Sequence, residues 1–465
     1  MPAQIIMFQR TYGCSAGAGT DWGYSVQQTT DNGYILAGVS DGFSSSDDIL
    51  LVKTDSFGDT LWTKILGSPV TSEAAFSVKQ TYDGGYVLVG GYLNGGYNDV
   101  YLLKTNSNGN LQWTKVYINP NKNEGGSAVK QTSDGGFIIV GANSDNSTNI
   151  YLLKTDSNGD TLWTKSYGGT NYEVGNDVQE TFDKGYIITG VSYNLQPDGN
   201  DVYLIKTNSN GDTLWTKTYG GTKNDQGISV QQTFDGNYII VGYTESFSSY
   251  REVYLIKTDS NGDTLWTKVI SNPNSVWAKG FCIDETADKG FIISGGINIG
   301  AQLVDAYLIK TNSSGDTLWT RIYGGIGSDW STSVQQTTDK GYILLGSSDS
   351  YDNYQHYYLV KTDSLGNTSP LVGVFEQQEA AAVAGEITIY PNPFATQANL
   401  VLPNEINTNG EAELVIYNIT GNETARVKIT AQRALIEREN LSAGMYFCKV
   451  IKENTVIATG KFIIQ

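Results

Sequence analysis

The first three quarters of the chain consist of short runs of β-forming residues separated by polar turns. One stretch reads V-Q-E-T at 178–181, Y-I-I-T-G at 186–190, V-Y-L-I-K-T at 202–207 and T-L-W-T-K at 213–217. Turns containing Asp, Asn and Gly separate such runs, and these residues close tight hairpins between antiparallel strands. The pattern predicts four short antiparallel strands, which we call A to D in chain order.

This four-strand pattern recurs seven times. The string K-T-[DN]-S-x-G-[DN], which follows the third run, begins at Lys53, Lys104, Lys154, Lys206, Lys257, Lys310 and Lys361. The distance along the chain from one of these lysines to the next is typical of the repeat units in propellers and other repeat architectures. The sequence therefore predicts an all-β fold, a seven-bladed β-propeller of four-stranded blades, over residues 1–370.

The two ends of the repeat region complement each other. The seventh unit has no L-W-T-K run after Lys361, whereas residues 7–13 near the N-terminus align with residues 214–220 of a complete unit. We expect the N-terminal strand to be the outermost strand of the last blade. This pairing would close the ring and leave no open sheet edge there.

Two strings in the repeat resemble known propellers. The string from Trp215 to Gly221, followed by Asp225, Val230 and Gly242, resembles the seven-bladed β-propeller (SBBP) repeat of bacterial surface and secreted proteins. The step from Gly159 to Trp163 is similar to the tryptophan-docking motif of quinoprotein propellers. That resemblance implies that a set of outer-strand tryptophans packs onto the next blade: Trp62, Trp113, Trp163, Trp215, Trp266 and Trp319.

The composition changes after Pro370. Residues 371–385 carry neither strand nor helix-cap signals and are expected to be a linker. Residues 386–465 contain no Asp and no Trp, and their six short β runs predict a small β-sandwich.

Three strings in this second domain resemble the C-terminal sorting domain of type IX secretion substrates. They are Y-P-N-P-F at 390–394, I-Y-N-I-T-G at 416–421 and L-S-A-G-M-Y at 441–446. The resemblance implies that residues 386–465 engage the type IX secretion machinery of a Bacteroidetes-type, Gram-negative bacterium. It further implies that the protein is secreted or displayed on the outer cell surface. In such proteins this domain is usually removed during surface anchoring. Residues 1–6 are too short for a signal peptide, so we expect the sequence to start at or near a mature N-terminus.

Charge and composition exclude several classes of function. The net charge is −18, which argues against nucleic-acid binding, because phosphate contacts need clustered Lys and Arg. No apolar run reaches the roughly 18 residues of a membrane span. The single histidine, His356, excludes sites built on two imidazoles, and the three cysteines match no metal spacing.

Loop lengths point to one face of the propeller. The A–B and C–D turns have constant length in every unit, whereas the D–A and B–C loops vary. In a propeller those two variable loops share one face, at the mouth of the central channel. Variable loops on a rigid scaffold commonly carry function, so we expect ligands to bind on this face.

Aromatic residues gather in one sector of that face. We place Trp22, Trp277 and Trp330 in D–A loops of three consecutive units, with Phe43, Tyr351 and Tyr354 in neighbouring B–C loops: these six are the candidate ligand-binding residues. Two interpretations remain open. The rings either plug the channel mouth or form a platform on which sugar faces stack.

An acidic residue also recurs five positions before the inner-strand Val or Ile. The set is Asp21, Glu73, Glu124, Glu173, Asp225 and Asp329, with Ala278 in the remaining unit. We favour carboxylates that accept N–H bonds from their own D–A loops. The alternative is a carboxylate ring that holds Ca²⁺; no other cofactor is expected.

The units differ from one another in aromatic residues rather than in acids and bases, which favours binding over catalysis. We expect a secreted or cell-surface binding module for a glycan or a protein. A carboxylate-based polysaccharide hydrolase or lyase is the first alternative, since such chemistry needs only two carboxylates. A purely structural surface protein is the second.

Overall fold

Each repeat unit folds into one four-stranded antiparallel sheet, and the chain divides into two compact units, Met1–Leu371 and Val372–Gln465. The computed structural model describes residues 6–13, 19–43, 46–68, 70–94, 97–118, 123–144, 147–169, 172–193, 199–300, 303–351, 354–369, 385–402, 412–418, 423–429, 431, 433–438, 441–452 and 455–465. Over these residues the ordered elements are all strands. The expected linker at 371–385 lies outside the described residues, apart from Gly385.

Within the described part of the first unit there are seven four-stranded sheets, which we call blades 1 to 7. Blades 1 to 3 are β2 (Asp21–Gln28), β3 (Tyr34–Ser40), β4 (Asp48–Thr54), β5 (Thr60–Leu66); β6 (Ser72–Gln80), β7 (Tyr86–Asn94), β8 (Tyr97–Thr105), β9 (Leu111–Tyr117); and β10 (Asn123–Gln131), β11 (Phe137–Ser144), β12 (Thr148–Thr155), β13 (Thr161–Tyr167). Blades 4 and 5 are β14 (Tyr172–Glu180), β15 (Tyr186–Tyr193), β16 (Asn200–Thr207), β17 (Thr213–Tyr219); and β18 (Asp225–Gln232), β19 (Tyr238–Thr244), β20 (Glu252–Thr258), β21 (Thr264–Ile270). Blades 6 and 7 are β22 (Ser275–Glu285), β23 (Phe291–Ile299), β24 (Val304–Thr311), β25 (Thr317–Tyr323); and β26 (Asp329–Gln336), β27 (Tyr342–Ser348), β28 (His356–Thr362) with β1 (Phe8–Tyr12).

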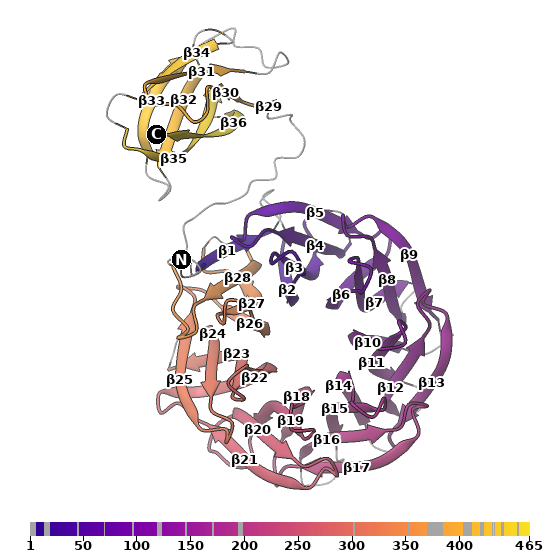
Figure 1. Cartoon of the computed structure of the whole chain (residues 1–465). Helices are drawn as coiled ribbons and strands as arrows, with labels where there is room; N and C mark the ends of the chain where they lie inside the picture. The colour runs from indigo at the N-terminus through magenta and orange to yellow at the C-terminus, as the bar shows by residue number, and fades with distance from the viewer. Residues whose placement is uncertain are drawn as a thin grey trace. The chain divides into compact units, whose positions relative to one another are not determined.

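The blades stand around a central axis, with the first strand of each nearest the centre and the last at the rim (Figure 1). Strand β1 pairs antiparallel with β28, from Phe8 opposite Lys361 to Tyr12 opposite Tyr357. Chain segments from the two ends of the unit therefore build one blade, and the predicted all-β propeller fold with its N-terminal closing strand is confirmed.

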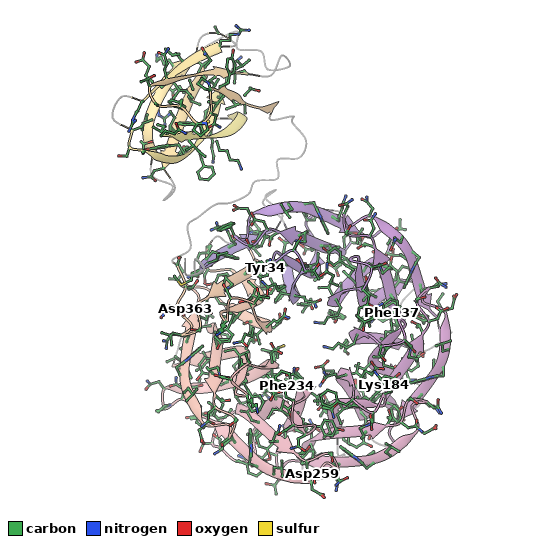
Figure 2. The ribbon with its side chains drawn as sticks, viewed as in Figure 1. Tyr34, Phe137, Lys184, Phe234, Asp259 and Asp363 are labelled. Atoms are coloured by element: carbon green, nitrogen blue, oxygen red, sulfur yellow. The ribbon has the colours of Figure 1, made fainter. Side chains whose placement is uncertain are left out.

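An aromatic ring on each outermost strand joins its blade to the next. The ring of Trp163 lies 5.9 Å from that of Tyr186, which begins the second strand of blade 4, and the other docking tryptophans repeat this contact. Figure 2 labels two residues that receive such rings, Tyr34 and Phe137. In the closing strand Phe8 takes the place of tryptophan, 6.1 Å from Tyr34. The docking role that the motif implied is thus seen at every junction.

The C–D turn of the next blade covers each docking ring. In blade 4 that turn has Gly211 at φ +76°, and a Cβ there would lie 2.8 Å from the ring of Trp163. Only glycine fits both the positive φ and the close approach. The Tyr167 hydroxyl donates to the Gly211 carbonyl at 2.6 Å, which locks the same junction.

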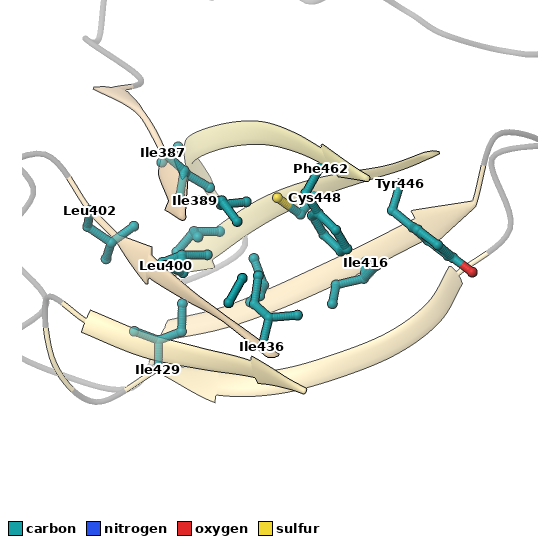
Figure 3. Close-up of a cluster of buried hydrophobic side chains, with 14 of the residues drawn as sticks. Ile387, Ile389, Leu400, Leu402, Ile416, Ile429, Ile436, Tyr446, Cys448 and Phe462 are labelled. Atoms are coloured by element: carbon teal, nitrogen blue, oxygen red, sulfur yellow. The ribbon is translucent and has the colours of Figure 1, made fainter. Parts of the chain in front are cut away.

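The second unit is a small sandwich of two sheets. A five-stranded sheet has the order β29-β36-β35-β32-β33, and a three-stranded sheet has the order β30-β31-β34. The strands are β29 (Gly385–Glu386), β30 (Thr388–Tyr390), β31 (Gln397–Val401), β32 (Ala412–Asn418), β33 (Glu423–Ile429), β34 (Arg433–Glu437), β35 (Gly444–Lys452) and β36 (Thr455–Ile464). Ile389, Leu400 and Ile436 from one sheet pack against Ile416, Phe462 and others from the second (Figure 3).

Candidate functional site

The innermost strand of every blade carries a β-bulge at the same place. In β2 the register with β3 shifts between Gly23 and Ser25, so that Tyr24 is the extra residue. A bulge redirects a side chain and is common beside functional sites. The seven extra residues all line the central cavity: Tyr24, Phe76, Ser127, Asn176, Ile228, Phe281 and Thr332.

This central cavity, which we call the channel cavity, has a volume of about 490 Å³. One ring of its lining comes from the residue after the inner-strand Val or Ile, and we call that ring the collar: Gln27, Lys79, Lys130, Gln179, Gln231, Asp284 and Gln335. Each collar glutamine uses its Oε1 to accept a backbone N–H from the next blade. Gln27, for example, accepts from Gln80 at 2.7 Å. The collar therefore also connects neighbouring blades.

Charge is distributed unevenly around this cavity. Blades 2 and 3 place Lys79 and Lys130 in the collar, while blade 4 contributes Asp177, whose Oδ1 lies 3.8 Å from Lys130 Nζ. Burial and the charge of Lys130 lower the pKa of Lys79 to about 8. The expected absence of acid–base asymmetry among the units is therefore wrong for the channel. The sequence shows this difference in charge one residue after the inner-strand Val or Ile, a position that lies in a strand and outside the variable loops.

A second hollow lies on the face of the D–A and B–C loops, and it is lined by blades 2 to 4 together with Asp47 of blade 1. This mouth pocket has a volume of about 320 Å³, and its lining includes Phe76, Leu93, Asn98, Asn123, Glu124 and Tyr172. Phe76 is 39% exposed and Tyr172 is 46% exposed. Edge-to-face contacts with Tyr24 and Tyr193 hold these two rings in place. The pocket lies on the face that the variable loops indicated, but in a different sector from the predicted aromatic residues.

The structure places the three predicted loop tryptophans in strands rather than in loops. Trp22, Trp277 and Trp330 lie near the beginning of β2, β22 and β26, because each inner strand extends further toward the mouth than the sequence indicated. Trp277 and Trp330 meet edge to face, with centroids 5.5 Å apart and planes at 80°. Phe281 adds a third ring, 6.0 Å from Trp330.

The other aromatic candidates are less closely associated. Trp22 is 39% exposed, and Phe43 and Tyr354 are exposed as well. Tyr351 packs against Tyr358 inside blade 7, with their hydroxyl oxygens 3.2 Å apart. The structure therefore brings together Trp277 and Trp330 but does not join all six residues in one surface.

The acidic register lies at the junctions between blades, and its side chains are buried: Asp21, Glu73, Glu124, Glu173, Asp225 and Asp329. Asp225 Oδ2 accepts from the Gly221 N–H at 2.9 Å and from the Ser246 hydroxyl at 2.6 Å. Asp329 Oδ2 accepts in the same way from Gly325 at 3.0 Å and Ser350 at 2.6 Å. These bonds fit carboxylates that brace their own D–A loops.

Asp21 faces the first residue of β28, the third strand of the preceding blade. Its Oδ2 lies 3.2 Å from Nδ1 of His356. In the described part of the chain, no three His, Cys, Asp or Glu side chains come together as metal ligands. The geometry thus supports loop bracing, and it gives His356 a scaffold position.

Comparisons with known proteins agree with this architecture. Residues 388–465 match the secretion system C-terminal sorting domain. Such a domain directs export through type IX secretion to the cell surface or extracellular space of Bacteroidetes, which confirms the expected localisation. Among the described residues, no helix is long and apolar enough to cross a bilayer. No curated protein matches the chain.

Solved structures share the fold at low identity. Puromycin hydrolase is 10% identical with a TM-score of 0.52, the match covering 84% of this chain and 60% of that chain. A PL25 polysaccharide lyase, an ulvan lyase, is 10% identical with a TM-score of 0.51, over 76% and 96% of the two chains. These likenesses concern the fold alone. Residues 47–295 match the family described as outer membrane protein assembly factor BamB. Because this match covers more than half of the chain, the protein belongs to that family.

Proposed function

We propose that this protein is an exported binding module that takes a glycan into the mouth pocket. The observation that carries the proposal is the composition of that hollow, in which two exposed rings, Phe76 and Tyr172, stand beside amide and carboxylate groups. Sugars present apolar ring faces for stacking and hydroxyls for hydrogen bonds, so a pocket of this kind suits them. Its volume of about 320 Å³ suits one or two sugar rings rather than a protein surface.

The polar groups of the pocket are held in position. The Asn98 N–H donates to Asn123 Oδ1 at 3.0 Å, which fixes that amide at the pocket wall. The buried Glu124 also lines the pocket. Fixed acceptors lose little entropy when a hydroxyl binds, and this favours recognition of a specific sugar.

The tryptophan sector is a second contact region in this proposal. Because Trp277 and Trp330 meet at 80°, together they do not offer one flat stacking surface. Trp22, Phe43 and Tyr354 are exposed around the same face and would extend the site for a longer chain of sugars.

We also infer that the repeats are of the SBBP type and form seven blades. The domain boundaries in this proposal are residues 1–370 for the propeller, 371–385 for the linker and 386–465 for the sorting domain. Cleavage would remove the sorting domain during surface anchoring.

The test is a glycan array probed with the full chain, followed by titration of the strongest ligand. We expect Phe76→Ala and Tyr172→Ala to weaken binding about tenfold each, as anchor aromatics do. Phe234→Ala and Tyr82→Ala are matched controls, because these exposed rings lie in A–B turns on the opposite face. Equal losses in the controls, or no glycan bound at all, would contradict the proposal.

A polysaccharide hydrolase or lyase is the second candidate. The observation that favours it is the placement of unlike charges, Lys79, Lys130, Asp177 and Asp284, in one cavity. Incubation with acidic polysaccharides, followed by assays of reducing ends and of unsaturated products, distinguishes the two functions. Turnover that Asp284→Asn abolishes would support catalysis, whereas binding without product formation supports the module.

A further inference from the structure

Five of the seven collar positions make the same contact with the next blade. The acceptors are Gln27, Gln179, Gln231, Gln335 and, through its Oδ2, Asp284; they receive N–H bonds from Gln80, Gln232, Glu285, Gln28 and Gln336 at 2.6–2.9 Å. The scaffold therefore uses this position to accept a backbone N–H from the next blade. A side-chain oxygen of glutamine or aspartate meets this requirement.

Blades 2 and 3 break this rule in neighbouring positions. Lys79 and Lys130 are ammonium groups, which donate hydrogen bonds and cannot accept them. Two like charges side by side in a partly enclosed cavity also repel each other. Neither lysine is therefore explained by the junction that the other five residues serve.

The acids of the cavity do not neutralise these lysines fully. Asp177 accepts from the Val178 and Val230 N–H groups and from the Ser229 hydroxyl, at 2.9–3.1 Å. Asp284 is likewise bound by the Gln336 N–H and, at 3.4 Å, by the Gln231 amide. Lys130 lies 3.8 Å from Asp177, beyond hydrogen-bond distance. Among the described residues, Lys79 Nζ has no hydrogen-bond or ion-pair partner.

We propose that the channel cavity binds the oxyanion group of a small ligand, a carboxylate, sulfate or phosphate, between Lys79 and Lys130. The glutamine on either side of the pair supports this assignment. Gln27 and Gln179 give their Oε1 atoms to backbone N–H groups, so each presents an NH₂ donor as its remaining polar group. Two ammonium groups flanked by two amide donors form a set that suits an oxyanion.

This site goes beyond the proposed glycan function and does not depend on it. The cavity volume of about 490 Å³ admits an oxyanion together with a body of a few carbon atoms. Tyr24, Phe76 and Phe281 from the bulges line the same cavity and offer apolar surface to that body.

The occupancy of the site depends on pH. Burial and the neighbouring Lys130 lower the pKa of Lys79 to about 8. The other titratable groups that act on Lys79 are Cys282, Asp177 and Asp284. Burial raises the pKa values of Cys282 and Asp284, so the thiol stays neutral near pH 8. Lys79 loses its proton as the pH rises through about 8, and we expect anion binding to weaken over that interval.

The test is calorimetric titration of the full chain with sodium sulfate, phosphate and glucuronate at constant ionic strength. Lys79→Gln and Lys130→Gln install the residue that other blades already have at this position, so both variants retain a residue that the fold accepts. We expect each to weaken binding at least tenfold, since each removes one charge-assisted contact. Lys223→Gln, which removes an exposed loop charge, is the matched control.

The three anions identify the source of the group, because a sugar acid, a sulfate and a phosphate differ in shape and charge. Saturable binding that both collar variants abolish and Lys223→Gln leaves unchanged supports the proposal. Binding that the collar variants leave intact, an equal loss in Lys223→Gln, or no saturable binding of any of the three anions overturns it. Affinity that stays constant between pH 7 and pH 9.5 contradicts the role of Lys79.

Discussion

At the scale of single residues, buried charge organises every blade. A lysine on the third strand is almost fully buried and reaches an aspartate in the A–B turn, as in Lys104 with Asp83 at 2.9 Å. The same pair recurs in all seven blades, at distances up to 3.2 Å. Removing the aspartate leaves a buried ammonium group without its ion-pair partner, so the K-T and T-x-D strings reflect one structural requirement.

These pairs predict sensitivity to acid. Burial acts to raise the pKa of Asp83, but bonds from Thr81, Lys104 and the Gly85 N–H outweigh it and hold the pKa at about 2. Equivalent bonds also hold the pKa values of Asp134 and Asp235 at about 2. Because the folded pKa lies below the unfolded value, the stabilisation is complete above about pH 4 and is lost as the pH falls toward 2. The melting temperature should therefore fall as the pH is lowered from 7 to 2. In Asp83→Asn this dependence of the melting temperature on pH should be weaker.

Glu252 has the opposite pH dependence. It sits at the junction where Ala278 replaces the usual acid, its Oε2 has no hydrogen-bond partner among the described residues, and burial raises its pKa to about 7. Its folded pKa exceeds the unfolded value, so its contribution is complete below about pH 4.5 and is lost as the pH rises through 7.

We therefore expect Glu252→Gln to raise the melting temperature by a few degrees at pH 8 and to change it little at pH 5. Glu245→Gln is the control. Its partner Arg251 lies 2.6 Å away, and the substitution should lower stability at both pH values. If Glu252→Gln melted at a lower temperature than the unsubstituted protein at pH 8, the ionised carboxylate of Glu252 would stabilise the fold, which contradicts this prediction.

At the scale of the strand, the repeat made the fold predictable. Strand type, hairpin turns and the docking rings all follow from residue patterns that recur in each unit. The A–B turn tolerates Lys184 at φ +67°, a backbone region where L-residues are uncommon; this residue is labelled in Figure 2. Such details do not alter the pattern from which the fold was inferred.

The bulges and the channel charges were less accessible from sequence. A bulge inserts one residue without changing the composition of the strand, so alternation alone does not reveal that Tyr24 turns into the channel. The position of Asp177 is Ser in four other units, and that of Lys130 is Gln in four other units. Only the fold shows that these positions face one cavity. The mouth pocket likewise combines residues of blades 1 to 4, a grouping that loop lengths did not indicate.

The docking ring is the strand feature with the largest expected energetic effect. Trp163 fills the space between Tyr186 and Gly211 of the next blade, so alanine leaves a cavity at the junction. We expect Trp163→Ala to lower the free energy of unfolding by about 3 kcal/mol. The adjacent Leu162 is exposed, and Leu162→Ala should cost less than about 0.5 kcal/mol in the same urea titration.

At the scale of the molecule, the two units have separate hydrophobic cores. The core of the second unit contains buried side chains from Ile387 to Ile464, and the clusters of the first unit lie between its own adjacent blades. Removal of residues 386–465 should therefore leave the melting temperature of the propeller unchanged while abolishing export from its native host. A large shift in that melting temperature would mean that the units stabilise each other.

The closing strand joins the two ends of the propeller. Phe8 and Tyr12 are buried, the Tyr12 hydroxyl donates to the Gly58 carbonyl at 2.6 Å, and Arg10 lies 3.6 Å from Asp59. The strand thus bonds to β28 along its length and packs on blade 1 as well.

Phe8→Asp should therefore destabilise the propeller by about 3–5 kcal/mol, since it buries a charge where a ring filled the junction. Phe8→Trp supplies the docking residue of the other six blades and should retain most of the stability. If the strand detaches, β28 becomes an exposed edge, and such edges pair with other chains. Size-exclusion chromatography should then show oligomers for Phe8→Asp but not for Phe8→Trp; equal melting temperatures and a monomeric Phe8→Asp would mean that the ring holds without its closing strand.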